Sequence, residues 1–139
     1  MKNWFLSLNG AITLSVIAFL TVLGRIFMDW RYESHLLGAA GSLDEFLYVL
    51  MFLVFLGIYI WGMLAAINGS RRGLIACFIM VLLLNIGFAL AFYLSWCPPA
   101  SCTSSPNMLR WNLIHLIAGL FAAIALVFQL TGKKVAGDR

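Results

Sequence analysis

Residues 46–63 of the chain read FLYVLMFLVFLGIYIWGM, a stretch without a single charged side chain. The apolar run continues to Ala66, which gives it the ~20 residues that an α-helix needs to cross a hydrocarbon core ~30 Å thick. A soluble domain carries about 25% charged residues. This 139-residue chain carries 10% and is 63% hydrophobic, with a mean hydropathy of +1.00. The stretch therefore predicts a spanning helix of an integral membrane protein.

Three further runs have the same character. The sequence predicts four spanning helices, over residues 11–27, 46–66, 74–96 and 111–130. Lipid cannot satisfy backbone donors and acceptors, so these runs must form helices. The first run is longer than the apolar part of a signal peptide, and no small-residue cleavage site follows it, so we expect it to remain as a helix. We predict an all-α membrane protein with one domain over residues 1–139, an antiparallel bundle of four transmembrane helices.

The basic residues predict the orientation. With four spans, both termini and the loop between the second and third spans lie on one side of the membrane. That side carries Lys2, Arg71, Arg72, Lys133, Lys134 and Arg139, and the other carries Arg25, Arg31 and Arg110. The positive-inside rule then places both termini in the cytoplasm. We interpret the net charge of +4 as this topology signal, together with attraction to anionic lipids, and expect no nucleic-acid partner.

The loops differ in length. Residues 67–73 predict a tight turn, with Asn68 and Gly69 ending the second helix. The first outer loop is longer, and its segment Leu36–Ala40 is apolar enough to form a short interfacial helix. Ser42 and Glu45 have the spacing of a capping box before the second span.

Two of the three cysteines lie in residues 96–102, WCPPASC, just after the third span. This is the outer, oxidising side in the predicted topology, which favours a disulfide between Cys97 and Cys102. Four intervening residues allow the Cα separation of ~4.4 to 6.8 Å that a disulfide requires. Such a small ring stabilises by only roughly 2 kcal/mol, so we expect a structural clip. Cys77, in the third span, is expected to be a small buried apolar residue.

In size and topology the chain resembles the four-helix membrane thiol oxidases of the disulfide-bond-formation and vitamin K epoxide reductase type. The resemblance implies a relay of electrons between two cysteine pairs, one of them Cys-x-x-Cys, near a quinone. This chain has one outer pair, at Cys-x-x-x-x-Cys spacing, so the resemblance extends to size and topology only. No metal site is predicted, because the pair lacks further zinc ligands at a usable spacing.

Polar residues of the outer half form the candidate ligand-binding face. Its members are His35, His115, Arg25, Asp29, Glu33 and Arg110. Two histidines could ligate a haem, and the same face offers partners for a quinone head group, a metal or a lipid. The alternative is that His115 only hydrogen-bonds a loop or packs near the headgroups, since nothing in the sequence brings it close to His35.

Arg25 of this face and Asn85 lie within the predicted spans, where polar side chains need a partner. Arg25 either snorkels to the interface or pairs with an acid such as Asp29, one helical turn away. Asn85, near the middle of the third span, is expected to hydrogen-bond a neighbouring helix, a contact worth about 1 kcal/mol or less in membranes.

The leading functional hypothesis is a small, non-enzymatic membrane subunit that packs against a larger membrane complex and helps to assemble or stabilise it, in a bacterial inner membrane. The chain shows no nucleophile constellation and no phosphate loop, which favours a non-enzyme. Three alternatives stay open. One is an oligomeric transporter or channel lined by Asn85, another is a quinone-, haem- or lipid-binding protein, and the third is an immunity protein against pore-forming toxins.

Overall fold

A computed structural model describes the backbone of residues 4–5, 7–37, 43–95 and 106–136. It describes the side chains of residues 4–5, 7–27, 50–91, 93–94 and 109–132. Within these ranges all regular structure is helical. The elements are α1 (Leu8–Leu37), α2 (Leu43–Ile67), α3 (Arg71–Met80), the π-helix η1 (Val81–Gly87), α4 (Phe88–Ser95) and α5 (Pro106–Ala136).

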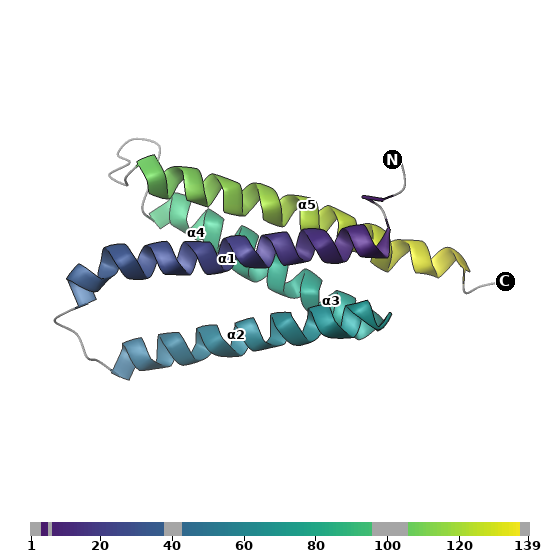
Figure 1. Cartoon of the computed structure of the whole chain (residues 1–139), viewed down its shortest axis with the longest axis horizontal. Coiled ribbons are helices and arrows are strands. Elements are labelled where there is room, and N and C mark those ends of the chain that lie inside the picture. The colour runs from purple at the N-terminus through teal and green to yellow at the C-terminus, as the bar shows by residue number, and fades with distance from the viewer. Residues whose placement is uncertain (1–3, 6, 38–42, 96–105, 137–139) are drawn as a thin grey trace.

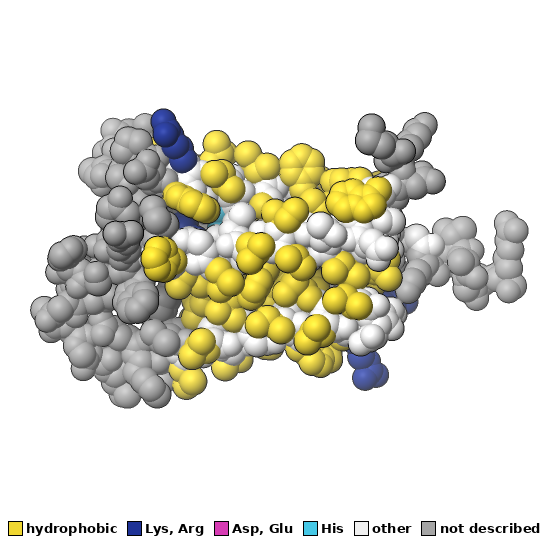
Figure 2. Space-filling model, viewed as in Figure 1, with side chains coloured by type: hydrophobic (Ala, Val, Ile, Leu, Met, Phe, Trp, Pro, Cys, Tyr) yellow, Lys and Arg dark blue, Asp and Glu magenta, His cyan; other side chains and the backbone are white. Residues whose placement is uncertain are grey.

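Together these elements form four continuous helices that are long and apolar enough to cross a membrane. The apolar spans are Leu8–Phe27, Leu50–Ile67, Arg71–Ala91 and Leu109–Gly132, and the third runs through α3, η1 and α4. Successive spans run in opposite directions, so α1 begins and α5 ends at the same end of the bundle (Figure 1). Hydrophobic side chains cover the middle of the molecule, and Lys and Arg side chains lie near its two ends (Figure 2). The four predicted helices are thus present and are long and apolar enough to span a membrane, as in a multi-pass membrane protein.

The first helix is longer than its apolar run. α1 continues to Leu37, so residues 28–37 are helical where the sequence predicted a loop. The reason is local, since this segment contains no glycine or proline before Gly38 and therefore no residue that stops a helix. Leu36 and Leu37 are consequently the last residues of α1 rather than part of a separate interfacial helix. Residues 38–42, including Ser42 of the expected capping box, lie outside the described residues.

The turn between α2 and α3 is as tight as the sequence predicts. Gly69 has a φ of +76°, which is the left-handed conformation that favours glycine. Its N–H donates to Ala66 O over 2.9 Å, and the N–H of Ser70 donates to Ala65 O over 3.0 Å. This is the Schellman pattern of a helix end. Ser70 then caps α3 by accepting from the N–H of Gly73 over 3.4 Å.

Small residues let α1 lie close to its neighbours. Ala11, Ser15, Ala18 and Val22 recur at spacings of four, three and four residues and are all buried. The most extensive contacts are between α1 and α5 and between α2 and α3. In lipid, helices associate through such close van der Waals packing because burial of apolar surface gives no advantage there.

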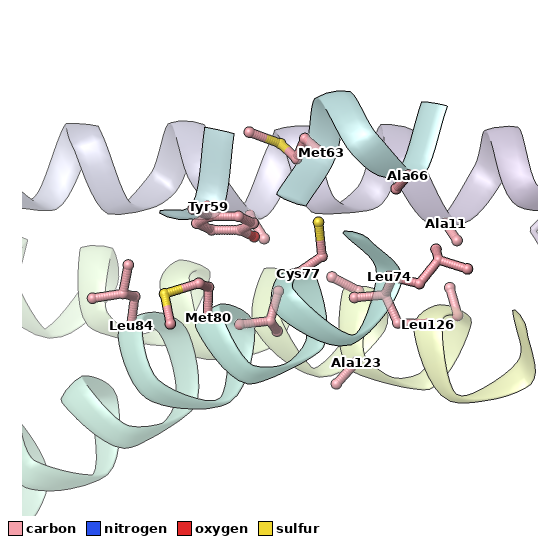
Figure 3. Close-up of a cluster of buried hydrophobic side chains, with 14 of the residues drawn as sticks. Ala11, Tyr59, Met63, Ala66, Leu74, Cys77, Met80, Leu84, Ala123 and Leu126 are labelled. Carbon is pink, nitrogen blue, oxygen red and sulfur yellow. The ribbon is translucent and has the colours of Figure 1, made fainter. Parts of the chain in front are cut away.

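The apolar core draws side chains from α1, α2, α3, η1 and α5 (Figure 3). Tyr59 of α2 is fully buried, and its hydroxyl donates to the carbonyl oxygen of Ser15 on α1 over 3.0 Å. Its ring meets Phe19 edge to face at a centroid distance of 5.2 Å. Cys77 is buried on α3 below α2, as expected, and its thiol is free.

Candidate functional site: a polar junction of three spans

Five polar side chains meet inside the bundle, at a level where the spans are otherwise apolar. We call them the polar junction, and they are Thr21, Arg25, Asn85, Asn112 and His115. Thr21 and Arg25 lie one turn apart on α1, and Asn112 and His115 lie one turn apart on α5, so each pair shares a helix face. Asn85 comes from η1. The junction therefore joins the first, third and fourth spans.

His115 links α5 to η1 and reaches toward α1. Its side chain is 1% exposed. Nε2 lies 2.6 Å from the carbonyl oxygen of Leu84, and because a carbonyl only accepts, Nε2 must carry the hydrogen and donate. Nδ1 lies 3.4 Å from Thr21 Oγ1. The imidazole is thus a crosslink between spans.

Asn85 links η1 to both α1 and α5. It is fully buried. Its Nδ2 lies 3.1 Å from Ala18 O, 3.3 Å from Thr21 Oγ1 and 3.4 Å from His115 O. The predicted hydrogen bond to a neighbouring helix is confirmed. A side-chain carbon at Gly119 of α5 would overlap the Asn85 Cβ, so glycine is what permits this approach.

Arg25 has a partner that the sequence reading did not consider. Its Nη1 donates to Oδ1 of Asn112, and Nδ2 of Asn112 donates to Ala89 O of α4 over 3.2 Å. Asn112 is fully buried, and Arg25 is half-buried. Asp29 lies on the next turn of α1, but its side chain is outside the described residues. The guanidinium is therefore directed inward, onto α5, by at least one of its donors.

The structure brings together two of the six candidate ligand-binding residues. Arg25 and His115 belong to the polar junction, whereas Arg110 is exposed one and a half turns before His115 on α5. The side chains of Asp29, Glu33 and His35 lie outside the described residues. So do Cys97 and Cys102, which leaves the expected disulfide a prediction.

Thr21 and Asn112 are the junction residues that the sequence reading missed. Both are uncharged, and neither disturbs an apolar run enough to stand out. The available signal was spacing, since Thr21 lies four residues before Arg25 and Asn112 lies three before His115. Two such pairs on two spans would have indicated facing polar stripes.

The polar junction is arranged to hold helices of the same chain together. The hydrogen-bonding atoms of His115 point to Leu84 and Thr21 within the bundle, and the ring is 1% exposed, so neither nitrogen is presented to a haem or quinone arriving from lipid. Asn85 is 0% exposed, so it lies inside one protomer rather than on a surface that several copies could share as a pore. Within the described side chains, no three His, Cys, Asp or Glu residues gather where they could hold a metal ion.

Comparison with known proteins adds no relative. No protein-family model, no curated protein and no solved structure matches the chain.

Proposed function

We propose that the chain is a small, non-enzymatic integral membrane subunit that packs against a larger membrane complex and helps to assemble or stabilise it. One observation carries the proposal. Three buried polar side chains of the spans, those of Asn85, Asn112 and His115, bond to other helices of the same chain. Polar groups that bond within the chain favour a rigid bundle, which can pack against other membrane proteins.

The outward surface offers a place for a partner. Ile117, Leu120, Phe121 and Ile124 line a shallow apolar depression on α5 and are 44–49% exposed. We call these four residues the α5 stripe. Their spacing of three, four and seven residues puts them on one helix face, which is the arrangement into which the ridge of another membrane helix fits. In the proposal this stripe receives a helix of a partner subunit.

The proposal includes an orientation and a location. Arg71 and Arg72 are exposed where α3 begins, at the end of the bundle where α1 begins and α5 ends (Figure 1). The positive-inside rule favours the cytoplasm for that end, and the basic residues there suit anionic lipid headgroups. We propose a multi-pass protein of a bacterial inner membrane with both termini in the cytoplasm.

The other functions have less support from the geometry. A channel lined by Asn85 would require that side chain on a water-filled surface, whereas it is fully buried within one protomer. A haem or quinone site at His115 would require an accessible ring nitrogen. The subunit proposal needs no such rearrangement.

Site-directed photocrosslinking in the native membrane tests the proposal. A photoreactive phenylalanine analogue replaces Phe121 in the α5 stripe, and in a matched variant it replaces Leu20, which is 57% exposed on α1. We expect an adduct with another integral membrane protein from position 121 and several-fold less of it from position 20. Adducts with lipid alone, or with a second copy of the chain alone, from both positions would contradict the proposal.

A further inference from the structure

One acceptor of the polar junction, Asn85 Oδ1, has no hydrogen-bond partner among the described residues. Asn85 is fully buried, and no donor among the described residues lies within hydrogen-bonding distance of its Oδ1. The amide nitrogen of the same side chain, by contrast, has three acceptors within 3.4 Å. The amide nitrogen of Asn85 is therefore hydrogen-bonded, and its carbonyl oxygen has no donor among the described residues.

The orientation of this amide is determined by its surroundings. Exchanging the oxygen and the nitrogen would place the side-chain oxygen against the carbonyl oxygens of Ala18 and His115, which cannot donate. The carbonyl of Asn85 must therefore point away from both. A buried acceptor left without a donor destabilises the fold, and hydrocarbon offers no donor to replace one.

Two neighbouring donors of the junction are already used. The Thr21 hydroxyl has one hydrogen and lies 2.7 Å from Ala18 O, so it donates there. His115 Nε2 donates to Leu84 O. In the neutral ring Nδ1 is then an acceptor, and its protein neighbour is Thr21 Oγ1 at 3.4 Å, whose hydrogen is engaged elsewhere. His115 Nδ1 is thus a second acceptor of the junction, to which the Thr21 hydroxyl supplies no hydrogen.

We propose that the polar junction holds one water molecule, which donates to Asn85 Oδ1 and to His115 Nδ1. Water has two hydrogens for the two acceptors, and a buried water generally has two to four polar partners. Thr21 Oγ1 lies 3.3 Å from the Asn85 amide nitrogen and 3.4 Å from His115 Nδ1, so the side chains of Asn85 and His115 belong to one cluster. The site lies against a π-helical turn, a wider turn than that of an α-helix and one that often occurs at functional sites.

Water-edited solid-state NMR of the full chain in lipid bilayers tests this site. Magnetisation is transferred from water to the carbon-bound ring protons of labelled His115, with the ring of Tyr59 as the control. Tyr59 is equally buried and also has an exchangeable proton, but its hydroxyl is bonded to a protein acceptor. We expect transfer to His115 that is several-fold faster than transfer to Tyr59. Equal rates for the two rings would overturn the proposal.

Two variants localise the signal. Asn85→Leu removes the acceptor, and we expect the rate at His115 to fall to that of Tyr59. Asn112→Leu, the matched control, removes another buried amide of the junction and should leave the fast transfer in place. Fast transfer that persists in Asn85→Leu would contradict the site. If Asn85→Leu does not fold, the comparison of His115 with Tyr59 in the unmodified chain decides alone.

Discussion

The Nε2 of His115 on α5 lies 2.6 Å from the carbonyl oxygen of Leu84 in η1, and both groups are buried. This contact joins the third and fourth spans, whose connection through residues 96–105 lies outside the described residues. A π-helical turn changes the backbone hydrogen-bonding register from that of an α-helix, and Leu84 O accepts from a side chain of another span. The bond therefore couples the irregular turn to the packing of α5.

Replacing His115 by leucine should destabilise the bundle. Leucine has a similar volume but no donor, so the carbonyl oxygen of Leu84 loses its side-chain partner. We expect the free energy of unfolding to fall by about 1–3 kcal/mol, measured by denaturant titration in detergent micelles. The control is Ile114→Leu, a position 49% exposed on the same helix, where we expect little change. Equal stabilities for the two variants would show that the bond to Leu84 contributes nothing.

The contact between Arg25 and Asn112 should appear as a coupling energy. A double-mutant cycle with Arg25→Met and Asn112→Leu should be non-additive by about 0.5–3 kcal/mol, because each substitution removes the same hydrogen bond. The control cycle pairs Asn112→Leu with Arg110→Met, since Arg110 is exposed. That cycle should be additive within about 0.5 kcal/mol. If both cycles are additive, the contact between Arg25 and Asn112 contributes nothing to the free energy of unfolding.

Gly119 and Gly57 should respond oppositely to alanine. A Cβ at Gly119 overlaps that of Asn85, so Gly119→Ala must push α5 away from η1, at a cost of about 1–3 kcal/mol. A Cβ at Gly57 meets nothing within 4 Å, so Gly57→Ala should be neutral or stabilise α2 by up to about 1 kcal/mol. Thermal unfolding of both variants checks the pair. A tolerated Gly119→Ala would be incompatible with the close approach of α5 to Asn85.

The predicted topology places Cys97 and Cys102 on the outer side of the membrane, where we expect them to form a disulfide. After reduction, Cys97 and Cys102 should react with a membrane-impermeant maleimide added from the outer side of oriented vesicles, and without reduction they should not. Cys77 is 1% exposed and should stay unlabelled in both cases. Labelling of the pair from the cytoplasmic side only, without reduction, would reverse the orientation and remove the disulfide.

Much of the fold follows from the sequence because hydrocarbon imposes few solutions. A long uncharged run such as residues 46–66 forms a spanning helix because lipid cannot satisfy its backbone groups. Gly69 marks the turn between α2 and α3, because glycine readily adopts the left-handed conformation found there. Helix ends were harder to predict, because outside the apolar run a helix continues until a breaker occurs. That is why α1 extends to Leu37.

The junction was predictable only in part. Asn85 could be assigned to a contact with another helix because a polar group at that depth needs a partner. Its acceptors could not be named, since Ala18 O and His115 O are backbone atoms of other spans. The partner of Arg25 also depends on how far α1 and α5 rotate toward each other, and single-chain spacing does not determine that rotation. The π-helical turn of η1 has no marker that we can identify in the sequence.

Native mass spectrometry of the chain, extracted from its own membrane in a mild detergent, is the sharpest test of the proposed function. We expect the 15.4 kDa chain within an assembly that contains other integral membrane proteins. We also expect a charged substitution in the α5 stripe, Phe121→Lys, to release the chain, whereas Leu20→Lys on α1 should leave the assembly intact. Detection of the chain alone, or only with copies of itself, would rule out a role as a subunit of a larger complex.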